Sequence, residues 1–109
     1  MRFLLFICQD DLFIRPAQID AEIRGWIREM DARGLRISGN RLDPAGSALT
    51  ITTVDNELVT MRGPFTDSPT QAAGYELVDV VDEAEAIEIA ALHPMARWGT
   101  IEIRAVDEE

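Results

Sequence analysis

Cysteine, histidine and basic residues are all scarce in this sequence of 109 residues. The single cysteine, Cys8, excludes an internal disulfide framework, and one cysteine with one histidine does not make a metal cluster, so we expect no metal. Ten basic residues against 20 acidic ones give a formal net charge of -10. Such a chain has no basic stripe for phosphates and is repelled by anionic lipids, so neither nucleic acid nor a membrane is an expected partner. No cofactor-binding motif is found either.

Long apolar runs are missing as well. The run over residues 3–8 is followed at once by Gln9, Asp10 and Asp11. A signal peptide needs an apolar core of about 7–15 residues, and a membrane span needs about 20. We therefore expect a buried strand here and a cytoplasmic protein. The hydrophobic content of 47% is too high for a disordered acidic tail,, and the length fits a single domain over residues 1–109.

The first half of the chain predicts a strand and then a helix. The strand, over residues 3–7, is apolar at every position, so we expect it to be covered on both faces. Pro16 suits the first position of a helix, and Gly34 suits its end. Between them, apolar residues recur at spacings of three and four, as in an amphipathic helix. They are Ile19, Ile23, Trp26, Ile27 and Met30.

The second half predicts a hairpin, a strand, a second helix and a last strand. Two β-branched runs, 48–54 and 57–61, are joined by a polar Asp-Asn turn, which favours a hairpin,. Strands are also predicted over 35–38, 74–80 and 100–106. Asp82 and Glu85 resemble a capping box at the start of a helix that ends before His93 and Pro94. The expected apolar face of that helix consists of Ala84, Ile87, Ala90 and Ala91.

This order predicts an α+β fold of the β-α-β-β-α-β type with an extra hairpin. Two helices can cover one face of such a sheet, which leaves apolar residues of the first strand on the other face. Large exposed apolar patches usually mark interfaces. We therefore expect a homodimer in which two sheets pack face to face.

Two segments carry a resemblance to a known family. Residues 63–79, which begin Gly63-Pro64-Phe65 and continue to Gly74-Tyr75, resemble the signature of the YciI-related family and, more narrowly, its Asp-Gly-Pro-Phe branch. Residues 93–104 resemble the closing segment of that branch. The resemblance implies a ferredoxin-like fold that forms a dimeric α+β barrel, with small-molecule chemistry by a histidine–aspartate pair.

The chain departs from the branch motif at two positions. Arg62 stands where the motif has aspartate, and Asp67 stands where glutamate is common. The first departure replaces a possible acid by a base. A mechanism that needs the motif aspartate is therefore not expected to operate unchanged in this chain.

His93 is the only side chain with an unperturbed pKa near neutrality,. It follows the second predicted helix, whose dipole would favour the protonated form. One hypothesis makes His93 and Asp67 the catalytic pair, with His93 as general acid or base. The alternative is that His93 caps helix carbonyls and that Asp67 belongs to an ordinary turn before Pro69.

Arginines and aromatic residues of the two family segments are the candidate substrate-binding groups. Arg62 and Arg97 could hold a small anionic organic ligand, or they could pair with the many surface acids. Phe65, Tyr75 and Trp98 could wall an apolar pocket, or they could belong to the core or the interface.

Two functions of different classes remain open from the sequence. One is a cofactor-independent lyase or isomerase that acts on a small organic acid through the His/Asp pair. The other is a non-enzymatic module for ligand sensing or protein interaction with a regulatory role. In that case the negative surface and the dimeric shape would be the functional features.

Overall fold

The computed structural model describes residues 1–108, and its elements follow the predicted order. They are β1 (Arg2–Asp10), α1 (Ile19–Ala32), β2 (Arg36–Arg41), the 3-10 turn η1 (Ala45–Ser47), β3 (Leu49–Val54), β4 (Glu57–Arg62), β5 (Thr70–Asp79), α2 (Glu83–Leu92), α3 (Met95–Trp98) and β6 (Thr100–Ala105). Apart from the hairpin β3–β4, the order is β-α-β-β-α-β. The predicted fold class is confirmed.

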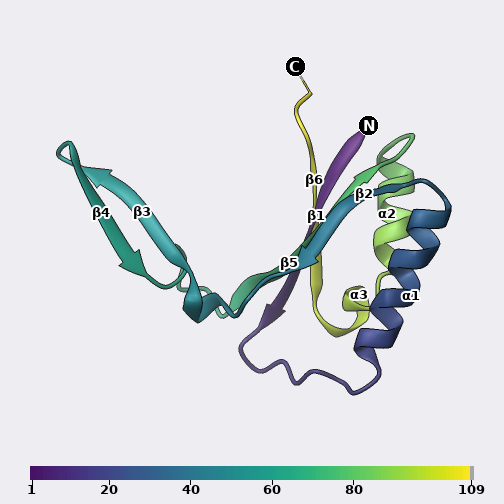
Figure 1. Cartoon of the computed structure of the whole chain (residues 1–109), viewed down its shortest axis with the longest axis horizontal. Helices are drawn as coiled ribbons and strands as arrows, with labels where there is room; N and C mark the ends of the chain where they lie inside the picture. The colour runs from purple at the N-terminus through teal and green to yellow at the C-terminus, as the bar shows by residue number, and fades with distance from the viewer. Residues whose placement is uncertain (109) are drawn as a thin grey trace.

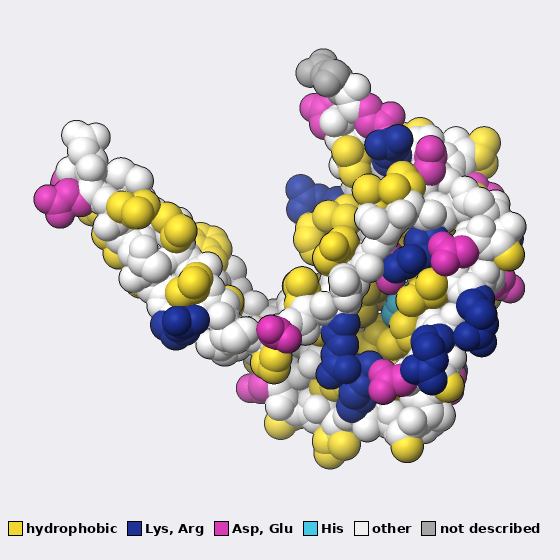
Figure 2. All heavy atoms as spheres, in the orientation of Figure 1, with side chains coloured by type: hydrophobic (Ala, Val, Ile, Leu, Met, Phe, Trp, Pro, Cys, Tyr) yellow, Lys and Arg dark blue, Asp and Glu magenta, His cyan; other side chains and the backbone are white. Residues whose placement is uncertain are grey.

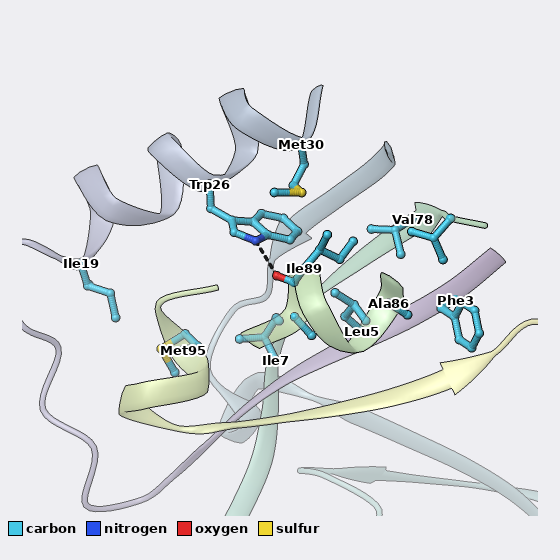
Figure 3. Packing of buried hydrophobic residues seen from close by; sticks show 12 residues of the cluster. Phe3, Leu5, Ile7, Ile19, Trp26, Met30, Val78, Ala86, Ile89 and Met95 are labelled. Carbon is cyan, nitrogen blue, oxygen red and sulfur yellow. Dashed lines mark hydrogen bonds between the residues drawn. The ribbon is translucent and has the colours of Figure 1, made fainter. Parts of the chain in front are cut away.

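Four strands form one antiparallel sheet in the order β2-β5-β1-β6. Both long helices lie on the same face of this sheet (Figure 1). The core is made by alternate residues of β1 and β5 packed against the two helices; it contains Phe3, Leu5, Ile7, Ile19, Trp26, Met30, Val78, Val80, Ala86, Ile89, Ala90 and Met95. Trp26 Nε1 donates a hydrogen bond of 2.9 Å to the Ile89 carbonyl, which ties α1 to α2 (Figure 3).

The other face of the sheet is bare in the single chain. Leu4, Phe6 and Cys8 alternate with the buried residues of β1 and are half-buried. Leu4 pairs with Leu77 and Phe6 with Tyr75 across the β1–β5 ladder, and directly opposed residues share a face,. The expectation that the first strand is covered on both faces is therefore not met within one chain. We call the face that carries Leu4, Phe6, Tyr75 and Leu77 the bare face.

The first helix begins three residues later than predicted. Pro16 precedes α1, and its carbonyl accepts a hydrogen bond of 3.2 Å from the Ile19 N–H. The prediction that Pro16 is the first helical residue was wrong. Pro16 belongs to a turn that precedes the helix, and this turn is closed by the hydrogen bond to the Pro16 carbonyl. The end of the helix is as predicted, because Gly34 adopts a positive φ of 71°, which favours glycine,.

The second helix is capped as predicted, but of the four residues predicted for its buried face only Ala90 is buried. Asp82 Oδ1 accepts a hydrogen bond of 2.9 Å from the Glu85 N–H. The buried residues are Ala86, Ile89 and Ala90, whereas Ile87 is 53% exposed. In an alanine-rich helix several faces have a similar apolar composition, so the sequence does not show which one is buried. In the structure the buried face is the one that carries Ile89, whose carbonyl bonds Trp26.

The hairpin β3–β4 stands away from the rest of the molecule as an arm (Figure 1). Its two strands pair only with each other, from Leu49–Arg62 to Val54–Glu57. Asp55 and Asn56 join them with φ values of 51° and 65°, the two positive angles of a type I′ turn,. The predicted hairpin is confirmed. The arm raises the radius of gyration to 15.7 Å, against about 13 Å for a compact chain of this length.

Several strands are longer than predicted, since β1 and β2 extend to Asp10 and Arg41, and one short helix was not predicted. Strand β5 begins at Thr70, ahead of the predicted residue 74, and the short helix α3 follows Pro94. Within residues 1–108, no helix is long and apolar enough to cross a membrane.

Candidate functional site

A cleft of about 610 Å³ lies where α1, β2 and β5 meet. It is lined by apolar residues at its base and by charged ones at its rim, and part of the histidine is visible inside it (Figure 2). The four arginines at the cleft are Arg15, Arg24, Arg36 and Arg41, and its acids are Asp10, Asp11, Asp20, Asp43 and Glu76.

His93 forms part of the cleft wall and is only 3% exposed. It is the C-cap residue of α2, and the Met95 N–H donates a hydrogen bond of 3.0 Å to His93 Nδ1. The Trp26 ring meets the imidazole edge-on, with 4.8 Å between ring centroids. The His93 side chain therefore caps the start of α3, and it is the backbone N–H of His93 that bonds a carbonyl of α2, that of Ala90.

The imidazole is neutral at physiological pH. Burial lowers the pKa of His93 to about 4, because the positive charge of the protonated ring would be poorly solvated away from water,. This opposes the shift expected from the helix dipole. With Nδ1 accepting a hydrogen bond, the proton lies on Nε2. Nε2 has no hydrogen-bond partner within residues 1–108, and no fully buried side-chain nitrogen or oxygen there lacks one. Nε2 therefore keeps a small contact with solvent, although the residue is only 3% exposed.

A buried ion pair forms a second wall of the cleft. Arg36 Nε donates a hydrogen bond of 2.7 Å to Glu76 Oε2, and the two side chains are 16% and 6% exposed. Burial raises the pKa of Glu76, against the opposing effect of the Arg36 hydrogen bond,. Gly39 allows this packing, because a Cβ there would overlap the Glu76 carboxylate.

The remaining arginines of the cleft differ in their partners. Arg15 forms an ion pair and hydrogen bonds with Asp20, and the pKa of Asp20 is lowered mainly by that hydrogen bond. Arg41 and Arg24 also lower this pKa by their charge. Neither of their guanidinium groups makes an ion pair or hydrogen bond with a residue in 1–108. Both are therefore available to an anion.

Only two of the seven residues proposed from sequence border this cleft, namely His93 and Tyr75, and Tyr75 shares the bare face with Phe6 rather than the inward side of β5 that carries Glu76. Asp67 and Phe65 lie on the exposed loop between β4 and β5, at the root of the arm, and Asp67 makes no contact with His93 in the chain. Arg62 lies at the end of β4, where its Nη1 donates to the Ser47 carbonyl at 3.4 Å.

Arg97 and Trp98 belong to α3, outside the cleft. Arg97 Nη2 bonds Glu22 Oε2 at 2.8 Å, and the guanidinium lies 5.4 Å from the centroid of the Trp98 ring. Arg97 and His93 both line a shallower hollow of about 420 Å³ between α1 and the start of α3. The ion pair is the alternative that the sequence left open for Arg97.

Sequence reasoning missed all the charged residues that line the cleft, among them Arg24, Arg36, Arg41 and Glu76. A signal existed for Glu76, because it occupies an inward position of β5, two residues from the buried Val78. Arg24 lies on the polar side of a helix, where arginine is ordinary. No group of three possible metal ligands occurs among the described residues, 1–108.

The fold and the cleft together define an α+β domain with a ferredoxin-like sheet and helices on one face only. The chain belongs to the YCII-related domain family, whose model matches residues 1–109. No curated protein matches the sequence closely enough to suggest an activity.

Proposed function

We propose that this protein binds a small organic acid in the cleft and acts on it as a cofactor-independent isomerase or lyase. The observation that carries the proposal is the pair Arg24 and Arg41, whose guanidinium groups form no ion pair or hydrogen bond within residues 1–108 and which line the same cleft as the buried neutral His93. Guanidinium groups bind carboxylates through paired N–H donors. The Gly63-Pro64-Phe65 segment further supports membership of the Asp-Gly-Pro-Phe branch, with Arg62 as its departure.

The roles of the side chains follow from their protonation. His93 presents Nε2–H, so it donates a hydrogen bond to a ligand carbonyl or carboxylate oxygen and does not act as the base at that atom. Glu76 has a raised pKa and shares the cleft, so it takes the role of the proton-transferring acid or base within one chain,. The pairing of His93 with Asp67 stays a prediction that would need the loop of a second copy.

A reaction of this kind begins with transfer of a proton from a carbon next to the ligand's carboxylate or carbonyl to Glu76. The electron pair of the broken C–H bond moves toward the oxygen that His93 and an arginine hold, which stabilises the developing negative charge. If the ligand carries a β,γ double bond, return of the proton from Glu76 to the γ-carbon shifts that double bond and gives an isomer. If the β-carbon carries a leaving group, that group departs with its bonding electron pair as a C=C bond forms, which gives a lyase product.

The experiment uses the wild-type protein with a panel of small carboxylates and observes the single histidine ring by NMR. Binding is expected to shift the ring signals. Arg24→Gln and Arg41→Gln should each weaken binding roughly tenfold, whereas Arg62→Gln, outside the cleft, should bind as the wild type does. Binding that is indifferent to both cleft variants, or the absence of binding by every acid, would overturn the proposal.

Catalysis is tested separately from binding. In D₂O, the wild type should exchange a carbon-bound proton of the bound acid, and Glu76→Gln should bind the acid without exchanging it. Binding without exchange by the wild type would refute the enzymatic role and favour the ligand-sensing module instead.

The same proposal includes a homodimer built on the bare face, which would complete an α+β barrel. Leu4, Phe6, Tyr75 and Leu77 give this face an apolar surface that no helix of the chain covers. The chain exposes 7447 Å², whereas a compact monomer of 12.2 kDa exposes about 6,100 Å²,. Analytical ultracentrifugation should detect a dimer that Phe6→Glu dissociates; a monomeric wild type at all concentrations would refute it.

A further inference from the structure

The arm formed by β3 and β4 carries apolar side chains on both of its faces. Leu49, Ile51 and Leu58 share one face by their cross-strand pairing and are 59%, 63% and 68% exposed. Val54 and Met61, on the opposite face, are 54% and 49% exposed. An isolated two-stranded hairpin is at best marginally stable in water. The arm therefore needs a surface that covers it.

The low charge of the arm also indicates that it is covered by a partner. Its two strands contain a single acid, Glu57, and a single base, Arg62, in a chain whose charged content is 28%. Interfaces are depleted of charged residues at their centre, whereas solvated surfaces of small domains are rich in them. The composition of the arm is that of an interface element.

The shape of the molecule shows where a covering body would sit. The arm projects on the side of the sheet away from the helices (Figure 1). The space-filling view shows a wide concavity between the arm and the body (Figure 2). Apolar side chains lie on the arm and on the side of the body turned toward it (Figure 2). A body seated on the bare face would therefore also meet the arm.

The exposed area is large enough for a second copy of this chain to be the occupant. The surface exceeds that of a compact monomer by about 1,300 Å², and a stable interface hides about 800 Å² on each partner. In a two-fold symmetric dimer both subunits contribute the same surface to the interface, so each arm would contact the other subunit in the same way.

We propose that in the homodimer each arm clasps the other subunit, so that the dimer is held by two reciprocal hairpins in addition to the contact of the two bare faces. This rests on the dimer of the proposed function and adds a separate contact to it. The loop that carries Phe65 and Asp67 lies at the root of the arm and thus at the boundary between the subunits. Its position outside the cleft of its own chain follows from the clasp.

The first test changes the arm without touching the sheet. Ile51→Glu and Leu58→Glu together should raise the dimer dissociation constant at least 100-fold, since two apolar side chains would lose their cover in each arm. Ile87→Glu is the matched control, because Ile87 is 53% exposed on α2, on the helical side. The control should change the constant less than about threefold. Analytical ultracentrifugation measures all three proteins.

The second test observes the arm directly and serves if the double variant fails to fold. Hydrogen exchange over residues 49–62 should be slow in the wild-type dimer and fast in Phe6→Glu, whose arm is intact but whose partner is lost. Fast exchange of the arm in a wild-type protein that is dimeric would overturn the clasp alone. A wild-type protein that is monomeric would overturn both the dimer and the clasp.

Discussion

Replacement of His93 by asparagine should abolish a loss of stability that the wild-type protein suffers as the pH falls from 6.5 toward 4. Burial lowers the pKa of His93 from 6.5 to about 4, so between these values the unfolded chain binds one more proton than the folded chain,. Stability therefore rises with pH across this window and is lost on acidification. The slope is about 1.4 kcal/mol per pH unit, and the total is about 3 kcal/mol.

Asparagine is the informative substitution because its Oδ1 can accept the Met95 N–H in place of Nδ1. The variant loses the contact with Trp26, which lowers its stability by an amount that does not depend on pH,. The measurement is urea unfolding at six pH values from 4 to 7.5, with the variant subtracted from the wild type. The acidic residues titrate in both proteins and cancel. Parallel stability curves would refute the assignment of a buried, neutral imidazole.

Three further predictions concern the backbone, a helix cap and the thiol. Gly39→Ala should destabilise the protein by about 1–3 kcal/mol, because its Cβ would lie 2.7 Å from a backbone oxygen and overlap a buried carboxylate,. The control is Gly46→Ala, whose Cβ would lie in open space, and it should change stability by less than about 0.5 kcal/mol. Thermal unfolding of both variants measures the difference. Asp82→Ala should cost about 1 kcal/mol by removing the N-cap of α2,, as measured by urea unfolding, and an unchanged midpoint would contradict the cap. Burial raises the pKa of Cys8, so the thiol should react slowly with iodoacetamide at pH 8,; reaction at the rate of a free thiol would contradict this.

The order of the elements could be predicted from the sequence because its signals are local. The Asp55-Asn56 turn and the Asp82 cap each depend on a few neighbouring residues, and both are found in the structure. The buried face of α2 could not be predicted, because alanines occur on several of its sides. Its rotation is fixed by tertiary packing, in which Ala86, Ile89 and Ala90 join the core and the Ile89 carbonyl accepts the Trp26 hydrogen bond.

The candidate site was predicted less well, for a reason of geometry. The sequence indicates a hairpin before the Gly63-Pro64-Phe65 segment but does not indicate its direction. In the structure the hairpin turns outward and holds Asp67 outside the cleft of its own chain. Arg24 and Arg41 lie on two different elements, α1 and β2, and meet at the cleft only because the helix packs against the sheet. That approach depends on tertiary packing.

The position of β1 in the sheet has a consequence for folding. This central strand pairs with β5 on one side and with β6 on the other, which end at residues 79 and 105. During synthesis the first strand therefore has neither neighbour until more than half of the chain has been made, and it gains the second only near the end. Pairings so distant in sequence slow folding, because a long loop must close before any contact rewards it. An apolar strand that waits this long is a surface on which chaperones can act.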